Sequence, residues 1–373
     1  MMKTKKARRP MLLIFILIFV PAFVLSLSGC SRTPSPDENG QTILVCGFAQ
    51  YDWVNNILGE NPSDIAVERL NESSADMHSY QPTVADMVKI ADCSLLIYTG
   101  GESEFWIDEA ILSSGKTDSS CLSLMEIFEG PEKLCENYSD ALSEHEHEHE
   151  AHSEDEHEHE AGSEDEHEHE ADSEDEHEHE AGSEDEHEHE ADEHLWLSLK
   201  MAPVFIEKIT ESICALDETN TLYYRKNSED YIKKITNLDS SYESVADAAR
   251  KTGRNLIIVA DRFPFAYLTD DYHIEHIAAF PGCSAETEAS FATILSLSDA
   301  VDRYLPGAVL ILKKSSPDLA HTVINNSDVK DLPVLFLDDM QSVTPKDIEE
   351  GCSYISVSED NLAAIRAALG TKK

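Results

Sequence analysis

Apolar residues follow two alternating patterns along most of the chain. Short runs rich in strand-forming residues are followed by longer stretches in which apolar residues recur at helical spacing. Strands are expected at 42–48, 64–70, 94–98, 255–260, 274–280, 308–312 and 333–337. Helices are expected at 51–58, 82–91, 201–216, 219–250, 263–270, 285–304, 317–325 and 359–369. Strands that alternate with helices in this way predict an α/β fold with mainly parallel sheets.

The longest helical pattern, near 219–250, contains no glycine or proline. At about 1.5 Å per residue, a helix of about 30 residues would be about 45 Å long, more than twice the usual length. We interpret it as a rigid connector between two α/β lobes. The predicted division is a first lobe at 42–218, a linking helix at 219–252 and a second lobe at 253–373.

The N-terminus carries the features of an export signal. Lysines and arginines precede an apolar run at 11–27, and the chain then continues to Cys30 through the tetrapeptide LSGC, which resembles a bacterial lipobox. This order predicts a lipoprotein signal peptide at 1–29, with Cys30 as the lipid-modified N-terminus. A retained membrane helix is the alternative, but the run is short and contains Pro21. The polar stretch at 30–41 suits a flexible tether, so we expect the protein at the extracytoplasmic face of the cell membrane.

Negative charge is concentrated in one segment. The chain has 28 Lys and Arg against 74 Asp and Glu, which gives a formal net charge of −46. Residues 143–193 contain 27 of these acidic residues and no Lys or Arg, so the rest of the chain carries −19. Such acidity excludes a nucleic-acid-binding protein, which needs a basic surface.

A ten-residue unit similar to AGSEDEHEHE repeats within this acidic segment. The unit has almost no apolar residues, so we expect the insertion to be disordered. Neutral imidazole binds zinc, copper and nickel, and repetition would create many weak sites at high local concentration. A solubilising spacer is the alternative, but it needs no histidine in every repeat. The histidines to which we assign auxiliary metal capture are His145, His147, His149, His157, His159, His167, His169, His177, His179, His187 and His189.

Four further side chains with metal-binding groups fall near the ends of predicted strands or beside the acidic segment. Asp261 and Asp338 each directly follow a predicted strand, His78 lies in the loop after the second strand, and His194 follows the repeats. Ligands of open α/β sheets bind beyond the carboxyl ends of the strands, so two donors from each lobe could close on one ion. Each residue alone has a commoner role, as a surface histidine or a helix-capping aspartate. Their coincidence with the His-rich segment favours a metal site.

A series of sequence motifs runs through nearly the whole mature chain. In order they are ADMHSYQPT, YTGGESEFW, the His-rich insertion, DEHLWLS, DETNTLYYRKNSEDY, FPFAYLTDDY, VLFLDDM and YISVSEDNLAAIRAAL. In this order they resemble the zinc-binding or manganese-binding substrate-binding lipoproteins of bacterial ABC transporters. The resemblance implies two α/β lobes joined by one rigid helix, with the metal buried in the cleft between them. It also implies that His78 and His194 are the first two ligands and that Asp338 is the aspartate ligand or lies next to the metal as a near-ligand.

One position departs from the pattern of this family. The family's third ligand, a histidine or a glutamate, lies three residues before the first aromatic residue of an FxY-type segment, which is FAY here. The third-ligand position is therefore Arg262, and a guanidinium group cannot bind a cation. Asp261 is the favoured substitute, and Cys283, Glu286 or water are the alternatives.

A site of two histidines and two carboxylates suits Zn(II), and it is also compatible with Mn(II), which prefers more oxygen ligands. The His-rich segment favours zinc. The resemblance implies a monomeric carrier that captures Zn(II) and delivers it to an ABC permease driven by a separate ATPase. The alternatives are a manganese carrier of the same family, a surface adhesin, or a metal buffer without a transporter. An enzyme is not expected, because the sequence contains no HExxH motif and no nucleophile elbow.

Overall fold

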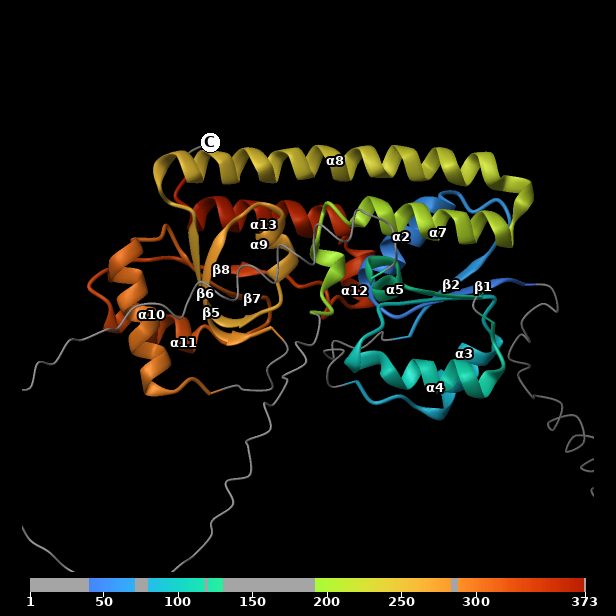
Figure 1. The fold of residues 1–373 in the computed structure, drawn as a ribbon, viewed down its shortest axis with the longest axis horizontal. Helices are drawn as coiled ribbons and strands as arrows, with labels where there is room; N and C mark the ends of the chain where they lie inside the picture. The colour runs from blue at the N-terminus through green and yellow to red at the C-terminus, as the bar shows by residue number, and fades with distance from the viewer. Residues whose placement is uncertain (1–39, 71–79, 118–119, 130–191, 283–287, 372–373) are drawn as a thin grey trace, which may run out of the picture. The chain divides into compact units, whose positions relative to one another are not determined.

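Two four-stranded sheets, in which all pairs of strands are parallel, form the framework of the protein (Figure 1). The N-terminal sheet has the order β2-β1-β3-β4 and consists of β1 (Thr42–Val45), β2 (Ala66–Arg69), β3 (Leu95–Tyr98) and β4 (Cys121–Ser123). The C-terminal sheet has the order β6-β5-β7-β8 and consists of β5 (Leu256–Phe263), β6 (Glu275–Pro281), β7 (Val309–Leu312) and β8 (Val334–Leu337). The predicted fold class, two α/β lobes with mainly parallel sheets, is confirmed.

This computed structural model describes residues 40–70, 80–117, 120–129, 192–282 and 288–371. Thr42–Lys373 forms one compact unit, distinct from Met1–Gln41, and the description below concerns the former. The predicted signal peptide, Cys30, His78, the His-rich repeats, Cys283 and Glu286 lie outside the described residues. Within the described ranges, no helix has the length and apolar character needed to cross a membrane.

Helices cover both faces of each sheet. In chain order they are α2 (Phe48–Leu58), α3 (Val84–Asp92), α4 (Phe105–Ser114), α5 (Leu124–Glu129), α7 (Ala202–Leu216), α8 (Thr221–Thr252), α9 (Ala266–Asp271), α10 (Phe291–Tyr304), α11 (Asp318–Asn326), α12 (Pro345–Glu349) and α13 (Tyr354–Ala368). Short 3-10 turns at Glu102–Glu104 (η2), Leu195–Leu197 (η4) and Glu218–Asn220 (η5) connect some of them.

Alternate residues of each central strand enter different cores, as the pleat of a strand requires. Ile43 and Val45 of β1 pack on the side of α2 and α7, whereas Leu44 packs on the side of α3 and α4. In the C-terminal sheet, Ile257 faces the core that includes α13, and Ile258 faces α10 and α11. Burial on both faces explains why these strands appear in the sequence as continuous apolar runs.

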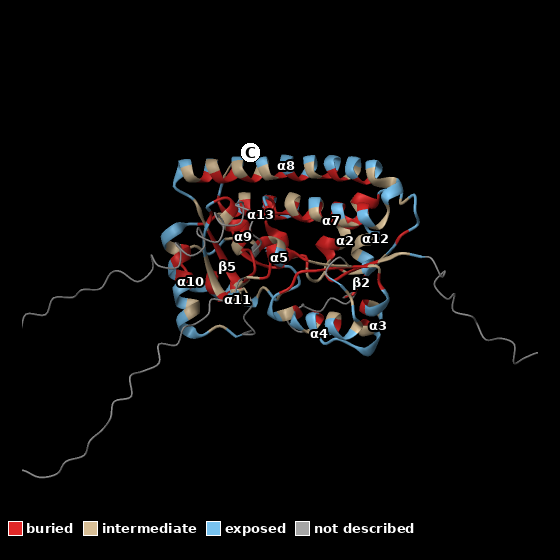
Figure 2. Ribbon diagram, turned by 45° about the vertical axis from the view of Figure 1, so that its right-hand side comes forward, coloured by how far each residue is buried: buried red, intermediate tan, exposed pale blue. Residues whose placement is uncertain are grey.

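The helix α8 packs along both lobes and has one buried face (Figure 2). Its Tyr231 hydroxyl lies 2.5 Å from Oδ2 of Asp52 on α2, and its Tyr242 hydroxyl donates to the carbonyl oxygen of Ser358 on α13 at 2.6 Å. The helix ends where Gly253 adopts a left-handed conformation, with φ of 68°. The role of this helix as a connector in the predicted domain division stays a prediction.

The two lobes share one hydrophobic core beneath α8. The indole of Trp53 on α2 stacks against Phe205 of α7, with ring centroids 6.1 Å apart, and meets the edge of Tyr354 on α13 at 5.3 Å. All three side chains are fully buried. The lobes are therefore held together on this side of the sheets by apolar packing.

The order of strands reverses between β1 and β3 in one sheet and between β5 and β7 in the other. In parallel sheets, the space beyond the carboxyl ends of the strands at such a reversal is the usual place for a ligand. The side chains that follow β1, β3, β5 and β7 are therefore the first to consider for a site, together with those that follow β8, the neighbour of β7.

Candidate metal centre

Three of the four predicted ligands, His194, Asp261 and Asp338, belong to the described part of the chain. The fourth, His78, lies outside it. Among the described residues, no three His, Cys, Asp or Glu side chains are grouped so that they could hold a metal ion. The three described ligands thus do not form a metal site on their own, and the complete ligand set stays a prediction.

The imidazole of His194 is 1% exposed and lies just before η4. Its Nδ1 is 2.6 Å from Oδ1 of Asp192, and the same oxygen accepts a hydrogen bond from the His194 backbone N–H at 2.8 Å. A carboxylate oxygen accepts hydrogen bonds, so this contact places the imidazole proton on Nδ1 and leaves the lone pair on Nε2. A carboxylate that orients a histidine in this way is the usual outer partner of a metal-binding imidazole.

Residues 192–201, which we call the His194 segment, are fixed by hydrogen bonds to the C-terminal lobe. Side chains or backbone groups from α9, from α13 and from the loop after β8 all take part. The bonds run from Tyr267 Oη to the Asp192 carbonyl (2.8 Å), from Tyr354 Oη to the Trp196 carbonyl (2.8 Å), from Trp196 Nε1 to the Asp339 carbonyl (2.9 Å) and from Ser198 Oγ to Asp271 Oδ2 (2.8 Å). The position of His194 therefore depends on the C-terminal lobe.

The His194 segment also contacts the N-terminal lobe, through Glu193. The Glu193 Oε1 atom accepts a hydrogen bond from the backbone N–H of Ser103 at 2.8 Å. Gly101 has φ of 85° and ψ of −171°, a conformation that is accessible almost only to glycine. A Cβ atom at this position would also lie 2.6 Å from Glu193 Oε1, so the close approach of the two segments requires glycine.

Asp338 directly follows β8, as the sequence predicted, and is 5% exposed. Its Oδ2 atom lies 2.7 Å from Nζ of Lys313, and its Oδ1 atom accepts a hydrogen bond from the backbone N–H of Met340 at 2.8 Å. Burial alone would lower the pKa of Lys313, but the bond to Asp338 and its charge outweigh this and raise that pKa. The carboxylate of Asp338 is thus engaged with a cation of the protein itself.

Asp261 does not lie beyond the end of a strand, and this part of the prediction is wrong. The strand β5 extends to Phe263, with a break in the register of its pairing between Val259 and Arg262. At this bulge the Asp261 carboxylate takes over backbone pairing: Oδ1 accepts from the Arg262 N–H at 2.9 Å and Oδ2 accepts from the Leu312 N–H at 3.1 Å. Its described contacts are those of a residue that joins β5 to β7, and its role as the substitute third ligand stays a prediction.

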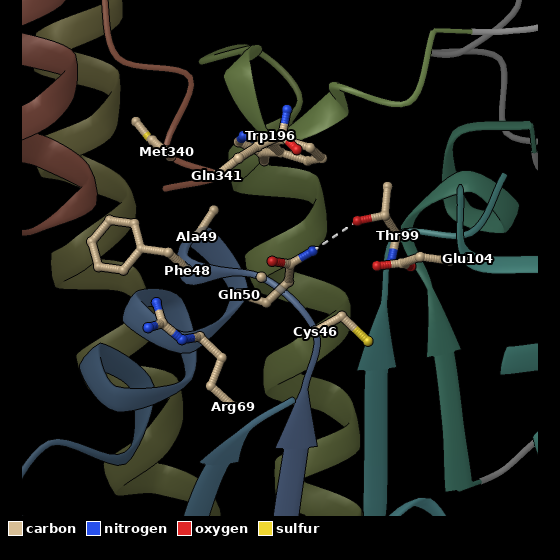
Figure 3. A pocket seen from close by; sticks show the side chains of 11 residues that line it. Cys46, Phe48, Ala49, Gln50, Arg69, Thr99, Glu104, Trp196, Met340 and Gln341 are labelled. Atoms are coloured by element: carbon tan, nitrogen blue, oxygen red, sulfur yellow. Dashed lines mark hydrogen bonds between the residues drawn. The ribbon is translucent and has the colours of Figure 1, made fainter. Parts of the chain in front are cut away.

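A pocket lies between the carboxyl ends of β1, β2 and β3 and the loop that follows β8 (Figure 3). Gln50 crosses it and donates from Nε2 to Oγ1 of Thr99 at 3.1 Å. On the opposite side lie Trp196, Met340 and Gln341, the last of which has its amide nitrogen 3.0 Å from Nε2 of His194. The remaining lining residues are Cys46, Gly47, Phe48, Ala49, Arg69 and Glu104.

Glu104 is the buried carboxylate of this pocket and is 3% exposed. Its Oε2 atom accepts hydrogen bonds from the backbone N–H groups of Thr99 at 2.7 Å and Gly100 at 2.9 Å. Burial raises the pKa of Glu104 to about 7, the two backbone bonds oppose this rise, and the charge of Glu193 adds to it. Burial also raises the pKa of the neighbouring Cys46 thiol.

The sequence analysis did not identify several residues that shape this region. Lys313 directly follows β7, so the rule applied to Asp338 could have found it. Cys46 lies inside the expected strand at 42–48, although β1 ends at Val45, and Glu104 lies in the turn η2 beyond β3, so that rule does not reach them. Gln341 carried no such signal, because its approach to His194 depends on how the loop after β8 folds.

Comparison with known proteins gives the following matches. Residues 43–368 match the family described as "Zinc-uptake complex component A periplasmic". The chain is 25% identical over 364 residues to the "High-affinity zinc uptake system protein ZnuA" of Bacillus subtilis (strain 168), a match that covers 95% of this chain and 98% of that protein. It is 25% identical over 351 residues to the "Zinc-binding lipoprotein AdcA" of Streptococcus pneumoniae (strain ATCC BAA-255 / R6), covering 94% of this chain and 60% of that longer protein.

The fold is similar to that of the Zn(II)-bound ZnuA-like domain of Streptococcus pneumoniae AdcA, with a TM-score of 0.60 at 20% sequence identity. This structural match covers 89% of the present chain and 99% of that one. The family match spans most of the chain, and the fold agrees with it. The chain belongs to the family of zinc-uptake complex component A periplasmic proteins.

Proposed function

We propose that this chain captures Zn(II) between its two lobes and delivers it to an ABC permease powered by a separate ATPase. The single observation that carries the proposal is His194, a buried imidazole whose Nδ1 is held by Asp192 and whose Nε2 faces Gln341 at the inter-lobe pocket. This is how a protein presents a neutral histidine to a metal. The family and the names of its zinc-binding relatives support the choice of cargo.

The other ligands in the proposal are His78 and Asp338, with Asp261 as the candidate for the remaining position. The strand β2 ends at Arg69, which lines the pocket, and His78 follows nine residues later in the sequence. Asp338 lies in the loop that also carries Met340 and Gln341 to the opposite side of the pocket. The proposed ligands therefore come from both lobes.

The place of the protein in the cell is part of the proposal. We propose that Cys30 carries a lipid that holds the protein at the extracytoplasmic face of the membrane, and that the histidines at 145–189 collect zinc loosely for the inter-lobe site. The relative AdcA is named a lipoprotein, which supports the anchor. Replacing Cys30 with Ala should release the protein from the membrane fraction, and unchanged retention would refute the lipid anchor.

Zinc titration tests the proposal. The mature chain without 143–190 should bind one zinc ion tightly in competition with a chromogenic chelator. Loss of outer partners of metal ligands commonly weakens metal binding about 10- to 100-fold, so His194→Ala and His78→Ala should weaken it at least that much. His321→Ala, at an exposed position of α11, is the matched control and should bind as the parent does. Equal zinc affinity in His194→Ala and the parent would refute the proposal, and tighter binding of manganese in the same assay would assign the manganese carrier instead.

A further inference from the structure

We infer that Gln341 is an affinity-determining residue: it caps the metal-binding nitrogen of His194, and zinc must displace it to bind. This inference rests on the proposed function. The amide nitrogen of Gln341 lies 3.0 Å from Nε2 of His194. Because Nδ1 of His194 carries the proton, Nε2 is the acceptor of this hydrogen bond and Gln341 is its donor.

The cap and the metal need the same space. Zinc bound to a histidine lies about 2.0–2.1 Å from the ring nitrogen, along the direction of its lone pair. An amide N–H donor uses the same lone pair, and at 3.0 Å its nitrogen leaves no room for an ion between the two atoms. An amide nitrogen has no available lone pair for a metal, so Gln341 cannot bind zinc in the orientation that it has here.

The backbone of the loop holds Gln341 in this position. The backbone N–H of Gln341 donates to Oδ1 of Asp339 at 3.1 Å, and the Asp339 carbonyl accepts from Nε1 of Trp196 at 2.9 Å. Met340, which is buried, has φ of 66°, in the left-handed region that a non-glycine residue seldom adopts. These contacts fix the backbone, so the cap can leave His194 most easily through rotation of the Gln341 side chain.

The cap lowers zinc affinity because its hydrogen bond to His194 is lost when zinc binds. The net worth of such a hydrogen bond corresponds to an effect of about 2- to 12-fold on an equilibrium constant. Gln341→Ala should therefore bind zinc about 2- to 12-fold more tightly than the parent. Gln341→Leu keeps most of the side-chain volume but cannot donate a hydrogen bond, so it separates the effect of the hydrogen bond on zinc affinity from the effect of steric shielding.

The experiment is a zinc competition titration of the full chain, followed through tryptophan fluorescence. Trp196 packs against the His194 ring, with ring centroids 5.2 Å apart, and its indole N–H is bonded to the loop that carries Gln341. The His-rich segment contains no tryptophan and is identical in all variants, so it does not alter the ratio of zinc affinities between a variant and the parent. Each variant is also tested with His194→Ala, and its thermal unfolding midpoint is compared with that of the parent.

Tighter binding by Gln341→Ala that disappears in the His194→Ala background, with an unchanged unfolding midpoint, supports the cap. Unchanged affinity overturns it. Weaker binding by Gln341→Ala also overturns it, because this result would make the turned amide oxygen a ligand. If His194→Ala itself leaves zinc affinity unchanged, the proposed function fails; if His194→Ala abolishes binding and Gln341→Ala has no effect, only the cap fails.

Discussion

Replacing Glu104 with Gln tests the electrostatics of the pocket at its most buried charge. The carboxylate accepts backbone hydrogen bonds from Thr99 and Gly100, and burial together with the charge of Glu193 raises its pKa from 4.5 to about 7. Glutamine keeps an oxygen that can accept both backbone bonds, but it never becomes charged. The variant therefore isolates the effect of ionisation.

The sign of the pH dependence follows from the direction of this shift. The folded protein holds the proton of Glu104 up to about pH 7, whereas the unfolded chain releases it near pH 4.5. The free energy of unfolding of the parent should therefore fall as pH rises between these two values. Each pKa unit corresponds to about 1.4 kcal/mol, so the whole shift amounts to about 3 kcal/mol. Glu104→Gln lacks this loss and should gain stability relative to the parent by about that amount between pH 4.5 and 8.

Denaturant unfolding at several pH values, followed by tryptophan fluorescence, measures this difference. The quantity of interest is the free energy of unfolding of the variant minus that of the parent, because all other titrating groups cancel. Glu109→Gln, at an exposed position of α4, is the matched control and should show no such trend. A difference that stays constant with pH, or that favours the parent as pH rises, would refute the assignment of a raised pKa to Glu104.

Two further substitutions test the contacts around the His194 segment. Gly101→Ala should lower the free energy of unfolding by about 1–3 kcal/mol in denaturant unfolding, because the new Cβ strains the backbone and meets Glu193. Gly115→Ala is the control: Gly115 also has a positive φ, of 73°, but a Cβ there meets open space, so this variant should lose less stability. Lys313→Met should raise zinc affinity up to about fivefold, because it removes the ion pair with Asp338 and releases that carboxylate for the metal. The factor corresponds to the free energy of a partly exposed ion pair. Weaker zinc binding in the competition titration would show that Lys313 serves the site in another way.

Most strands and the long helix could be predicted because each has a simple pattern, whereas the three-residue strand β4 was missed. The strand β3 and the helix α8 lie within a few residues of the expected 94–98 and 219–250. The helix α4 was not predicted, since its apolar residues point in several directions and Leu112 is 82% exposed. The start of α13 was also missed, because its capping box pairs Ser353 with a second serine instead of the usual Glu or Gln.

The site was less predictable than the fold because it depends on register and on contacts through space. Asp338 could be placed, since β8 ends one residue before it. The position of Asp261 could not be predicted, because the sequence does not reveal that β5 continues past a bulge to Phe263.

Gln341 is a stronger case of the same difficulty. Its amide reaches His194, which lies 147 positions away in the sequence, through a left-handed residue and two aspartate turns that carry no metal-binding signature. The sequence can therefore indicate which side chains are able to bind the ion. Gln341, which competes with the ion for the lone pair of His194, can be identified only from the folded structure, in which the loop after β8 contacts the His194 segment.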